Sequence, residues 1–471
     1  MGHNIAITAV GHRIAFFDLI TKSMMEKNAD LKVYWIIGSK FQYDFLLSIG
    51  WAPEDILLLN WDIRHGSGEP IGEYKLHELA YADRSLKYQF SEAMVYLAKM
   101  QSVFFDFVKA KNLQYIFGEM TAAHEILMNR ICQDKFPDTC FYLHPQSIRI
   151  PNKRFTFMDT EFQDTIIKKA QYIHGKEETD KYELPIKPVV PERVADVARD
   201  VKKSLTLKYK VSLLSVSVAN LFKQRPKDNV TGLPLTLSNK IDKFLTIEHN
   251  KYYYTKSLKR ATLADLQGKK FFFITLHMQP EASVDVVGRY YDDQFLLIRD
   301  VWRILPNDYY LVVKEHTNAI GNRGKEFFEK CKALRNVVLI HEEVHSHQLI
   351  QLADAIFANS GTVALEAALY EKDVFLFSNI FFDKLKYCHR ITLDDLKYTP
   401  NYFALLEKCR KRDSDKMTPE SFSDYIIRSS FAGVIDGHRG SPYYTDKENI
   451  ETIAKSFLLF LNKDNPRSDE A

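Results

Sequence analysis

Apolar and polar residues alternate along the first third of the chain in the rhythm of a parallel α/β fold. Apolar runs that predict strands lie at residues 4–10, 31–37, 56–59, 114–117 and 140–143. Amphipathic stretches that predict helices lie between them, at residues 14–26, 86–109 and 122–132. Strand, helix, strand is the order of a doubly wound parallel sheet, so residues 1–165 are predicted to form a Rossmann-like domain.

The same rhythm starts again at residue 269. Predicted strands lie at residues 271–278, 309–316, 336–343, 355–358 and 373–377, with helices at 293–304, 324–334, 347–352 and 362–370. Five parallel strands joined by short crossovers predict a second Rossmann-like domain over residues 269–445. The remaining segment, residues 446–471, contains a helical pattern at 448–461 that we expect to cross back onto the first domain.

Residues 166–268 interrupt the rhythm, beginning polar and proline-bearing and then becoming basic, and they predict a mostly helical insertion. Within it, residues 201–227 place a run of apolar and small residues between clusters of Lys and Arg. Such a helix can lie on the surface of an anionic membrane. The alternative, a helix packed against its own domain, is the commoner fate of an amphipathic face.

The predicted fold class is therefore α/β, with two Rossmann-like domains facing across a cleft in a GT-B-like arrangement. Ligands of open α/β sheets bind at the carboxyl ends of the strands, so functional residues should directly follow strands.

Composition narrows the class of protein. The chain has 64 Lys and Arg against 61 Asp and Glu, a balance that argues against binding bulk nucleic acid by net charge. Its five cysteines are widely spaced and are expected to be reduced. Neither a signal peptide nor a membrane-spanning run is apparent, so we expect a cytoplasmic protein, with peripheral membrane contact through residues 201–227 as the open alternative.

The strongest local signal is the sequence ADAIFANSGTVALEAALYEKDVFLF. A strand is followed by a tight turn and a helix, so the amides of Ser360, Gly361 and Thr362 should converge on one anion, with the helix dipole behind them. Such a site suits the phosphates of a nucleotide; alternatively, Ser360 only caps the helix. Glu366, one turn deeper, is predicted to bind ribose hydroxyls or orient Ser360, unless it is a structural salt-bridge partner.

Two further loops follow strands in the same half. His316, at the end of YYLVVKEH, can stabilise charge on a leaving phosphate, and Lys314 precedes it. The loop ITLHMQPEAS presents His277, Gln279 and Glu281. All five residues are predicted to line the site of the phosphate-bearing substrate, called the donor site below. A solvated charged loop would also explain His316.

The first domain supplies candidate residues for the side of the cleft that would bind a second substrate, the acceptor. Glu119 follows a strand in YIFGEMTAAHE, where a carboxylate can serve as general base or nucleophile. We predict Glu119 as the first choice for this role and Glu281 as the second. Side chains predicted to contact the acceptor are His12, Arg13, His124 and Arg149.

No metal dependence and no cofactor other than the nucleotide-sugar substrate are predicted. Acidic pairs occur only as Asp292-Asp293 and Asp394-Asp395, and neither forms a strand-end Asp-x-Asp. The sequence contains no GxxxxGK[ST], GxSxG or HExxH, which removes P-loop kinases, serine hydrolases and zincins from consideration.

The runs ITLHMQPEAS, VVKEHTN, NSGTVALEAALYEKDVF and FGEMTAAHE resemble the capsule polysaccharide biosynthesis family, which includes transferases that use CMP-activated Kdo. The resemblance implies that His316 matches the His of the family's HP motif, although Thr317 stands where that motif has Pro. It also implies that Ser360 and Thr362 match its phosphate-binding turn. The expected activity is transfer of a sugar, a CMP-linked acidic sugar being favoured, to a growing bacterial capsule or surface glycan.

Three alternatives stay open at this point. CDP-glycerol phosphotransferases of teichoic-acid assembly are similar in the same region, and non-hydrolysing nucleotide-sugar epimerases share the architecture. A non-enzymatic sugar-nucleotide or glycan-binding assembly factor is the third.

Overall fold

The chain forms two compact units in the computed structural model, which describes residues 2–9, 11, 13–189, 203, 206, 209, 228–233, 237–435 and 441–463. Unit 1 comprises Met1–Tyr182, Arg225–Pro234 and Asp424–Ala471, and unit 2 comprises Glu183–Gln224 and Leu235–Ser423. The predicted insertion is thus divided between the units: residues 166–182 belong to unit 1. The predicted membrane-contact segment is residues 201–227. Of these, the structure describes only residues 203, 206 and 209.

Unit 1 is built on a seven-stranded sheet in the order β13-β6-β5-β4-β1-β2-β3. Its strands are β1 (Asn4–Thr8), β2 (Lys32–Ile37), β3 (Ile56–Leu58), β4 (Tyr115–Phe117), β5 (Phe141–Ile148), β6 (Arg154–Met158) and β13 (Phe431–Ala432). The first five are parallel, and Ile5 lies opposite both Val33 and Tyr115. β6 and β13 extend this sheet antiparallel at one edge.

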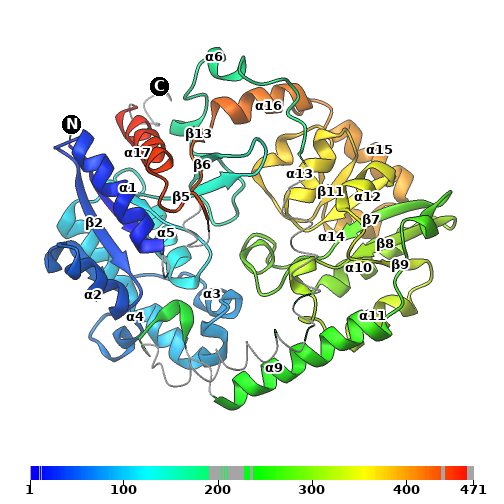
Figure 1. Ribbon diagram of the computed structural model, residues 1–471, viewed down its shortest axis with the longest axis horizontal. Coiled ribbons are helices and arrows are strands. Elements are labelled where there is room, and N and C mark those ends of the chain that lie inside the picture. The colour runs from blue at the N-terminus through cyan, green and yellow to red at the C-terminus, as the bar shows by residue number, and fades with distance from the viewer. Residues whose placement is uncertain are drawn as a thin grey trace. The chain divides into compact units, whose positions relative to one another are not determined.

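Helices surround this sheet and bury its apolar faces. They are α1 (Arg13–Lys27), α2 (Lys40–Ser48), α3 (Leu76–Ala82), α4 (Phe90–Lys111), α5 (Ala123–Lys135), α6 (Lys176–Thr179) and α17 (Lys447–Asn462). In Figure 1 the red helix α17 lies beside the blue helix α1, although the two are more than 400 residues apart in sequence.

The C-terminal helix completes the core of unit 1. The Phe457 ring lies 4.8 Å from that of Phe117 and 5.1 Å from that of Phe157, centroid to centroid. The Phe460 ring lies 4.4 Å from Phe157. Aromatic pairs at such distances stabilise a core beyond the area they bury, so the first sheet depends on the end of the chain.

Unit 2 contains a six-stranded, fully parallel sheet in the order β12-β11-β10-β7-β8-β9, the arrangement of a Rossmann fold. The strands are β7 (Lys270–Thr275), β8 (Tyr309–Lys314), β9 (Val337–Ile340), β10 (Ala355–Ala358), β11 (Val374–Leu376) and β12 (Cys388–Arg390). The helices are α9 (Leu237–Tyr252), α10 (Gln294–Arg303), α11 (Lys325–Ala333), α12 (Ser346–Leu352), α13 (Thr362–Leu369), α14 (Leu393–Tyr398), α15 (Tyr402–Arg412) and α16 (Pro419–Arg428), the last of which reaches into unit 1.

The predicted class, α/β with two Rossmann-like domains, is confirmed by these two sheets. The strand predicted at residues 140–143 is longer than expected, because β5 continues to Ile148, and a further strand, β6, begins at Arg154. The Arg154 side chain is buried and donates to the carbonyls of Ile427 and Ser430, so it holds the chain together rather than facing a ligand. Among the described residues, no helix is long and apolar enough to cross a bilayer.

Candidate functional site

Three loops meet at the carboxyl edge of the unit 2 sheet, where a parallel α/β sheet binds its ligands. They follow β7, β8 and β10 and carry the predicted donor residues. The loops are held by direct contacts: the Ser360 hydroxyl, after β10, donates to the Ser283 carbonyl, after β7, at 2.8 Å.

The turn after β10 has the backbone of an anion site. Gly361 is the N-cap residue of α13, with φ 98° and ψ 163°, a conformation almost restricted to glycine. No side chain of the described residues caps this helix, and the hydroxyl of Ser360 is directed to Ser283 instead. The alternative in which Ser360 caps α13 is therefore wrong. The first amides of α13 and its positive dipole end remain for a ligand.

Asn359 anchors this turn, a role that the sequence did not reveal. Its side-chain amide donates to the carbonyls of Gly288 and Tyr291, both at 3.1 Å, and its oxygen accepts from the Ser378 hydroxyl. A β-carbon at Gly288 would lie 2.2 Å from the Asn359 amide nitrogen. The loop after β7 must therefore carry a glycine where it passes the turn.

His277 packs directly against Gly361. A β-carbon added to Gly361 would lie 2.8 Å from His277 Cε1, so the ring covers the turn. Burial, with smaller effects from His316 and Arg323, lowers the pKa of His277 to about 4, and the ring is neutral at physiological pH. Its Nε2 is buried and has no hydrogen-bond partner among the described residues. A buried polar atom without a partner beside an uncapped helix start is suited to hydrogen-bond a ligand.

His316 lies just past the end of β8 and begins the short 3₁₀ turn Thr317–Ala319. Its Nδ1 accepts a hydrogen bond from the Asn318 backbone amide at 3.2 Å. In the neutral ring, an accepting Nδ1 leaves the proton on Nε2. Burial lowers the pKa of His316, while neighbouring Glu281 opposes that shift, so the ring is a neutral donor.

Arg323 joins two of the loops and was not predicted from the sequence. Its guanidinium forms an ion pair with Glu315 and donates to the His277 carbonyl. Glu315 also accepts from the His316 amide at 2.7 Å. Burial raises the pKa of Glu315, although Arg323 opposes the shift. The pair fixes His277 and His316 relative to each other.

Lys314 points to a different loop from the one carrying His316. Its ammonium donates to the Glu342 carbonyl, after β9, at 3.2 Å, and burial lowers its pKa. It therefore supports the edge of the site through a backbone contact.

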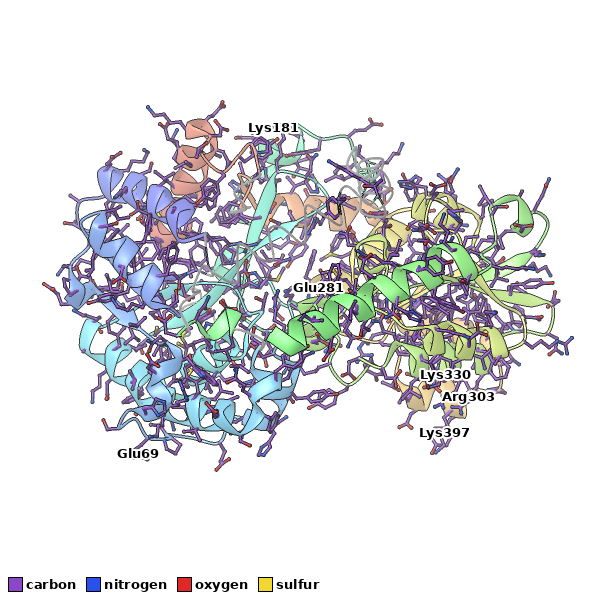
Figure 2. The ribbon with its side chains drawn as sticks, turned by 60° about the horizontal axis from the view of Figure 1, so that its bottom comes forward. Glu69, Lys181, Glu281, Arg303, Lys330 and Lys397 are labelled. Atoms are coloured by element: carbon purple, nitrogen blue, oxygen red, sulfur yellow. The ribbon has the colours of Figure 1, made fainter. Side chains whose placement is uncertain are left out.

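Gln279 and Glu281 lie in the loop after β7, and Glu281 is labelled in Figure 2. Both ends of the Gln279 amide are engaged, by Asp285 at 2.9 Å and Gln294 at 3.1 Å. One Glu281 carboxylate oxygen accepts from the Ser283 hydroxyl at 2.9 Å. Glu281 is half-buried and close enough to His316 to affect its pKa.

Thr362 is exposed at the start of α13, and Glu366 lies one helical turn further on. Glu366 is half-buried, and burial raises its pKa to about 7. A carboxylate in this position can accept two hydroxyl groups from a ligand whose anion is held at the turn.

The carboxyl edge of unit 1 carries a second polar group. Arg13, after β1, forms an ion pair with Glu119, after β4. The Thr121 hydroxyl donates to the other Glu119 oxygen at 3.3 Å. The Glu119 side chain is one quarter exposed, so a ligand can reach it.

The other residues predicted on the acceptor side have different surroundings. His124 is buried in α5, and burial lowers its pKa to about 4. Its neighbour Glu125 accepts from the amides of Thr121 and Ala122 and so caps α5; burial raises the Glu125 pKa to about 7. Arg149 is exposed between β5 and β6, and His12 lies outside the described residues.

In the part of the chain that the structure describes, no group of three or more His, Cys, Asp or Glu side chains is placed to hold a metal ion. Metal independence stays a prediction.

The fold and these edges define a protein of two Rossmann-like α/β units, each with polar residues at its carboxyl edge. A scan against protein-family models finds no match, and no curated protein matches the sequence. Among solved structures, S. aureus MnaA with UDP is 13% identical, covering 98% of both chains with a TM-score of 0.30. The UDP-GlcNAc 2-epimerase of Methanocaldococcus jannaschii, in complex with UDP-GlcNAc and UDP, is 12% identical over 91% of this chain and 98% of its own (TM-score 0.29). Thermosulfurimonas dismutans KpsC, a beta Kdo 2,7 transferase, is 12% identical over 76% and 88% (TM-score 0.33). Likeness at this level does not identify a reaction.

Proposed function

We propose that the chain is a glycosyltransferase that moves a sugar from a nucleotide-activated donor to a growing bacterial capsule or surface glycan. The observation that carries the proposal is the uncapped turn at Gly361, covered by His277, whose Nε2 is buried without a partner among the described residues. The likeness of these loops to the capsule polysaccharide biosynthesis family supports a CMP-linked acidic sugar as the donor.

Three groups around the start of α13 hold the donor. The amides that follow Gly361 hold a phosphate, helped by the positive end of the helix. His316 donates from Nε2 to an oxygen of the same phosphate. Glu366, one turn further on, accepts the two ribose hydroxyls.

Catalysis uses the same contacts. As the bond between the sugar and the phosphate breaks, negative charge grows on the phosphate, and His316 and the turn amides stabilise it. A carboxylate accepts the proton of the attacking acceptor hydroxyl. Glu119 and Glu281 are the two candidates, and substitution of each by Gln distinguishes them: the base variant loses turnover while nucleotide affinity is retained.

Thermal-shift measurement with CMP, CDP, UDP, GDP and dTDP tests the donor half of the proposal. One nucleotide should raise the unfolding temperature of the native chain and have no effect on Gly361→Ala. A series in which no nucleotide shifts the transition would refute the proposal.

A second measurement separates transfer from its alternatives. Each sugar nucleotide that binds is incubated alone and followed by NMR. Interconversion of the donor without an acceptor would identify an epimerase. In a separate incubation of CDP-glycerol with a glycan acceptor, release of CMP and transfer of glycerol phosphate to an acceptor hydroxyl would identify a phosphotransferase. Unchanged glycan output with both His316→Ala and Glu119→Ala would instead indicate an assembly factor.

A further inference from the structure

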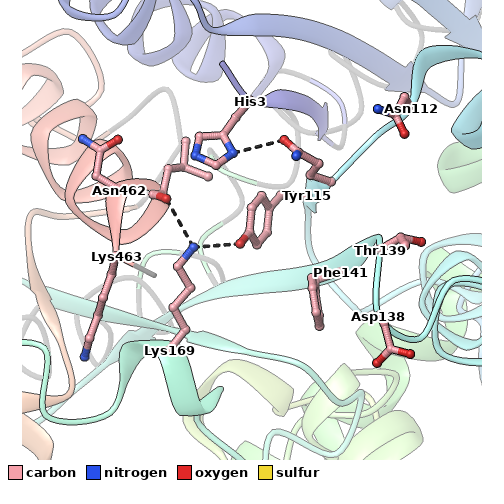
Figure 3. A pocket seen from close by; sticks show the side chains of 11 residues that line it. His3, Asn112, Tyr115, Asp138, Thr139, Phe141, Lys169, Asn462 and Lys463 are labelled. Atoms are coloured by element: carbon pink, nitrogen blue, oxygen red, sulfur yellow. Dashed lines mark hydrogen bonds between the residues drawn. The ribbon is translucent and has the colours of Figure 1, made fainter. Parts of the chain in front are cut away.

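A cavity of about 590 Å³ lies at the amino-terminal edge of the unit 1 sheet (Figure 3). Its wall includes His3 before β1, Tyr115 at the start of β4, Phe141 at the start of β5, and the end of α17. Arg13 and Glu119 lie past the opposite ends of β1 and β4. The cavity is therefore separate from the polar group at the carboxyl edge.

A buried cation is built into the wall of this cavity. Lys169 is only 3% exposed, and its ammonium donates to the Tyr115 hydroxyl at 2.7 Å and to the Leu461 carbonyl at 3.2 Å. The same nitrogen lies 4.7 Å from the centre of the Tyr115 ring and 4.9 Å from that of Phe460. Figure 3 shows Lys169 reaching between Tyr115 and the end of α17.

These contacts explain how a charge is retained there. The carbonyl end of a helix carries partial negative charge, and aromatic faces attract cations, so both offset the cost of burying an ammonium. Lys463 lies at the same end of α17 and also lines the cavity. The lining residues thus include two lysines and one carboxylate residue, Asp138, and the Lys463 ammonium donates to the Gln171 carbonyl at 3.4 Å. This excess of positive charge favours an anionic ligand.

The rest of the wall suits hydroxyl groups. Asn112, Thr139 and Asn462 offer amide and hydroxyl groups that both donate and accept. The Gln114 oxygen accepts from His3 and from the Asn4 amide, which leaves its NH2 group as a donor. Phe141 is half-buried and supplies an aromatic surface, against which the apolar face of a sugar ring packs. The volume lies within the range of small-molecule sites.

We propose that this cavity is a second binding site, which takes an acidic sugar: one sugar ring bearing a carboxylate or a phosphate. The hydroxyls pair with the amide side chains, the ring packs on Phe141, and the anion is attracted by Lys169 and Lys463. The site belongs to unit 1 alone and does not depend on the proposed transfer reaction.

Four probes test the ligand class by ligand-observed NMR and titration calorimetry: glucuronate, glucose 6-phosphate, glucose and inorganic phosphate. At least one acidic sugar should bind saturably, and glucose and inorganic phosphate at least tenfold more weakly. The tighter of the two acidic sugars identifies the anion as carboxylate or phosphate. Absence of saturable binding by both acidic sugars, or equal binding of glucose, would overturn the proposal.

Two variants locate the binding. Lys169→Met removes the charge and keeps the apolar stem, and should weaken binding at least tenfold. Thr139→Trp fills the cavity from an exposed position without disturbing the buried ammonium, so it should block binding even if Lys169→Met fails to fold. Gly324→Ala, in unit 2 and outside both proposed sites, is the control and should bind the acidic sugar as the native chain does. Unchanged affinity in Thr139→Trp would show that the sugar binds elsewhere.

Discussion

His316 uses its two ring nitrogens for different tasks. Nδ1 accepts the Asn318 amide and so caps a short turn, which leaves Nε2 as the donor. In the proposed reaction, His316→Ala removes a preorganised donor to the leaving phosphate and should lower kcat by about 100-fold. Steady-state kinetics with the identified nucleotide sugar measures the effect, and a loss below threefold would argue against this role.

His316→Asn separates the two tasks. Asn is among the best N-cap residues, so its side-chain oxygen can replace Nδ1 at the turn. Its NH2 group then takes the position of the His Cδ2 and is too short to reach the position of Nε2. The Asn variant should therefore unfold at the temperature of the native chain and remain as slow as His316→Ala. Recovery of activity by Asn would show that His316 acts only as a cap.

At this scale the sequence predicts residues that directly follow apolar strands and misses those that act through tertiary contacts. His277, His316 and Gly361 each follow a strand, so the pattern finds them. Arg323 lies 46 positions after His277 in the sequence, and it donates to the His277 carbonyl. A local sequence pattern does not reveal a contact between residues so far apart. Asn359 stood inside the motif, but its partners lie about 70 residues away.

Gly361 is the point on which the start of α13 depends. With φ 98° and ψ 163°, another residue there costs about 1–3 kcal/mol, and a β-carbon also collides with the His277 ring. Gly361→Ala should weaken nucleotide binding at least tenfold by calorimetry. Gly324→Ala is the matched control, since Gly324 also precedes a helix but has φ −81° and no atom within 3.6 Å of an added β-carbon. Equal nucleotide affinity in the two variants would exclude the turn as the phosphate site.

The edge strand β12 is held by a buried histidine between two carboxylates. His389 Nδ1 lies 2.8 Å from Asp413 and Nε2 lies 2.9 Å from Asp373. Arg410 pairs with Asp373, and Arg412 and Lys416 pair with Asp413. Burial alone would lower the pKa of His389, but the two carboxylates outweigh it and raise the pKa above its ordinary value.

This cluster predicts how stability depends on pH. Because the folded-state pKa of His389 is raised, the contribution is complete below the unfolded value of about 6.5 and is lost as pH rises through the folded value. The free energy of unfolding, measured with urea between pH 6 and 9, should fall across that window. His389→Leu should cost about 3 kcal/mol at pH 6 and flatten the dependence. Parallel pH curves for the variant and the native chain would contradict this assignment.

Strands with an apolar run were predictable, including the short edge strand β3, whereas the edge strands β12 and β13 were not. The predicted strands at the centres of both sheets agree with β1, β4, β7, β8 and β10. β12 has three residues, Cys-His-Arg, and β13 has two, so neither shows an apolar run; pairing with a neighbour defines them. No strand was predicted at β6, which pairs antiparallel with β5.

At the scale of the whole chain, unit 2 is contiguous from Leu235 to Ser423 apart from residues 183–224, whereas unit 1 needs both ends of the sequence. Residues 235–423 expressed alone should therefore unfold cooperatively and keep the nucleotide response. A chain ending at Ser423 lacks β13 and α17. Losing Phe457 and Phe460 costs about 3–5 kcal/mol each, comparable with the total stability of a domain.

Calorimetry of the two fragments measures these outcomes. The 235–423 fragment should show one transition, and the chain ending at Ser423 should lack the transition of unit 1. A native-like unit 1 transition without α17 would contradict the dependence of that core on the C-terminal helix.

The late position of α17 has a consequence for synthesis. Domains usually fold as they leave the ribosome, the N-terminal one first. Here the order is reversed, because Phe157 must wait for Phe457, about 300 residues later, while unit 2 has already emerged. At translation speeds of about 5–20 residues per second, the aromatic face of the first sheet stays uncovered for about 15–60 seconds. Apolar surface that is exposed in this way is prone to aggregation.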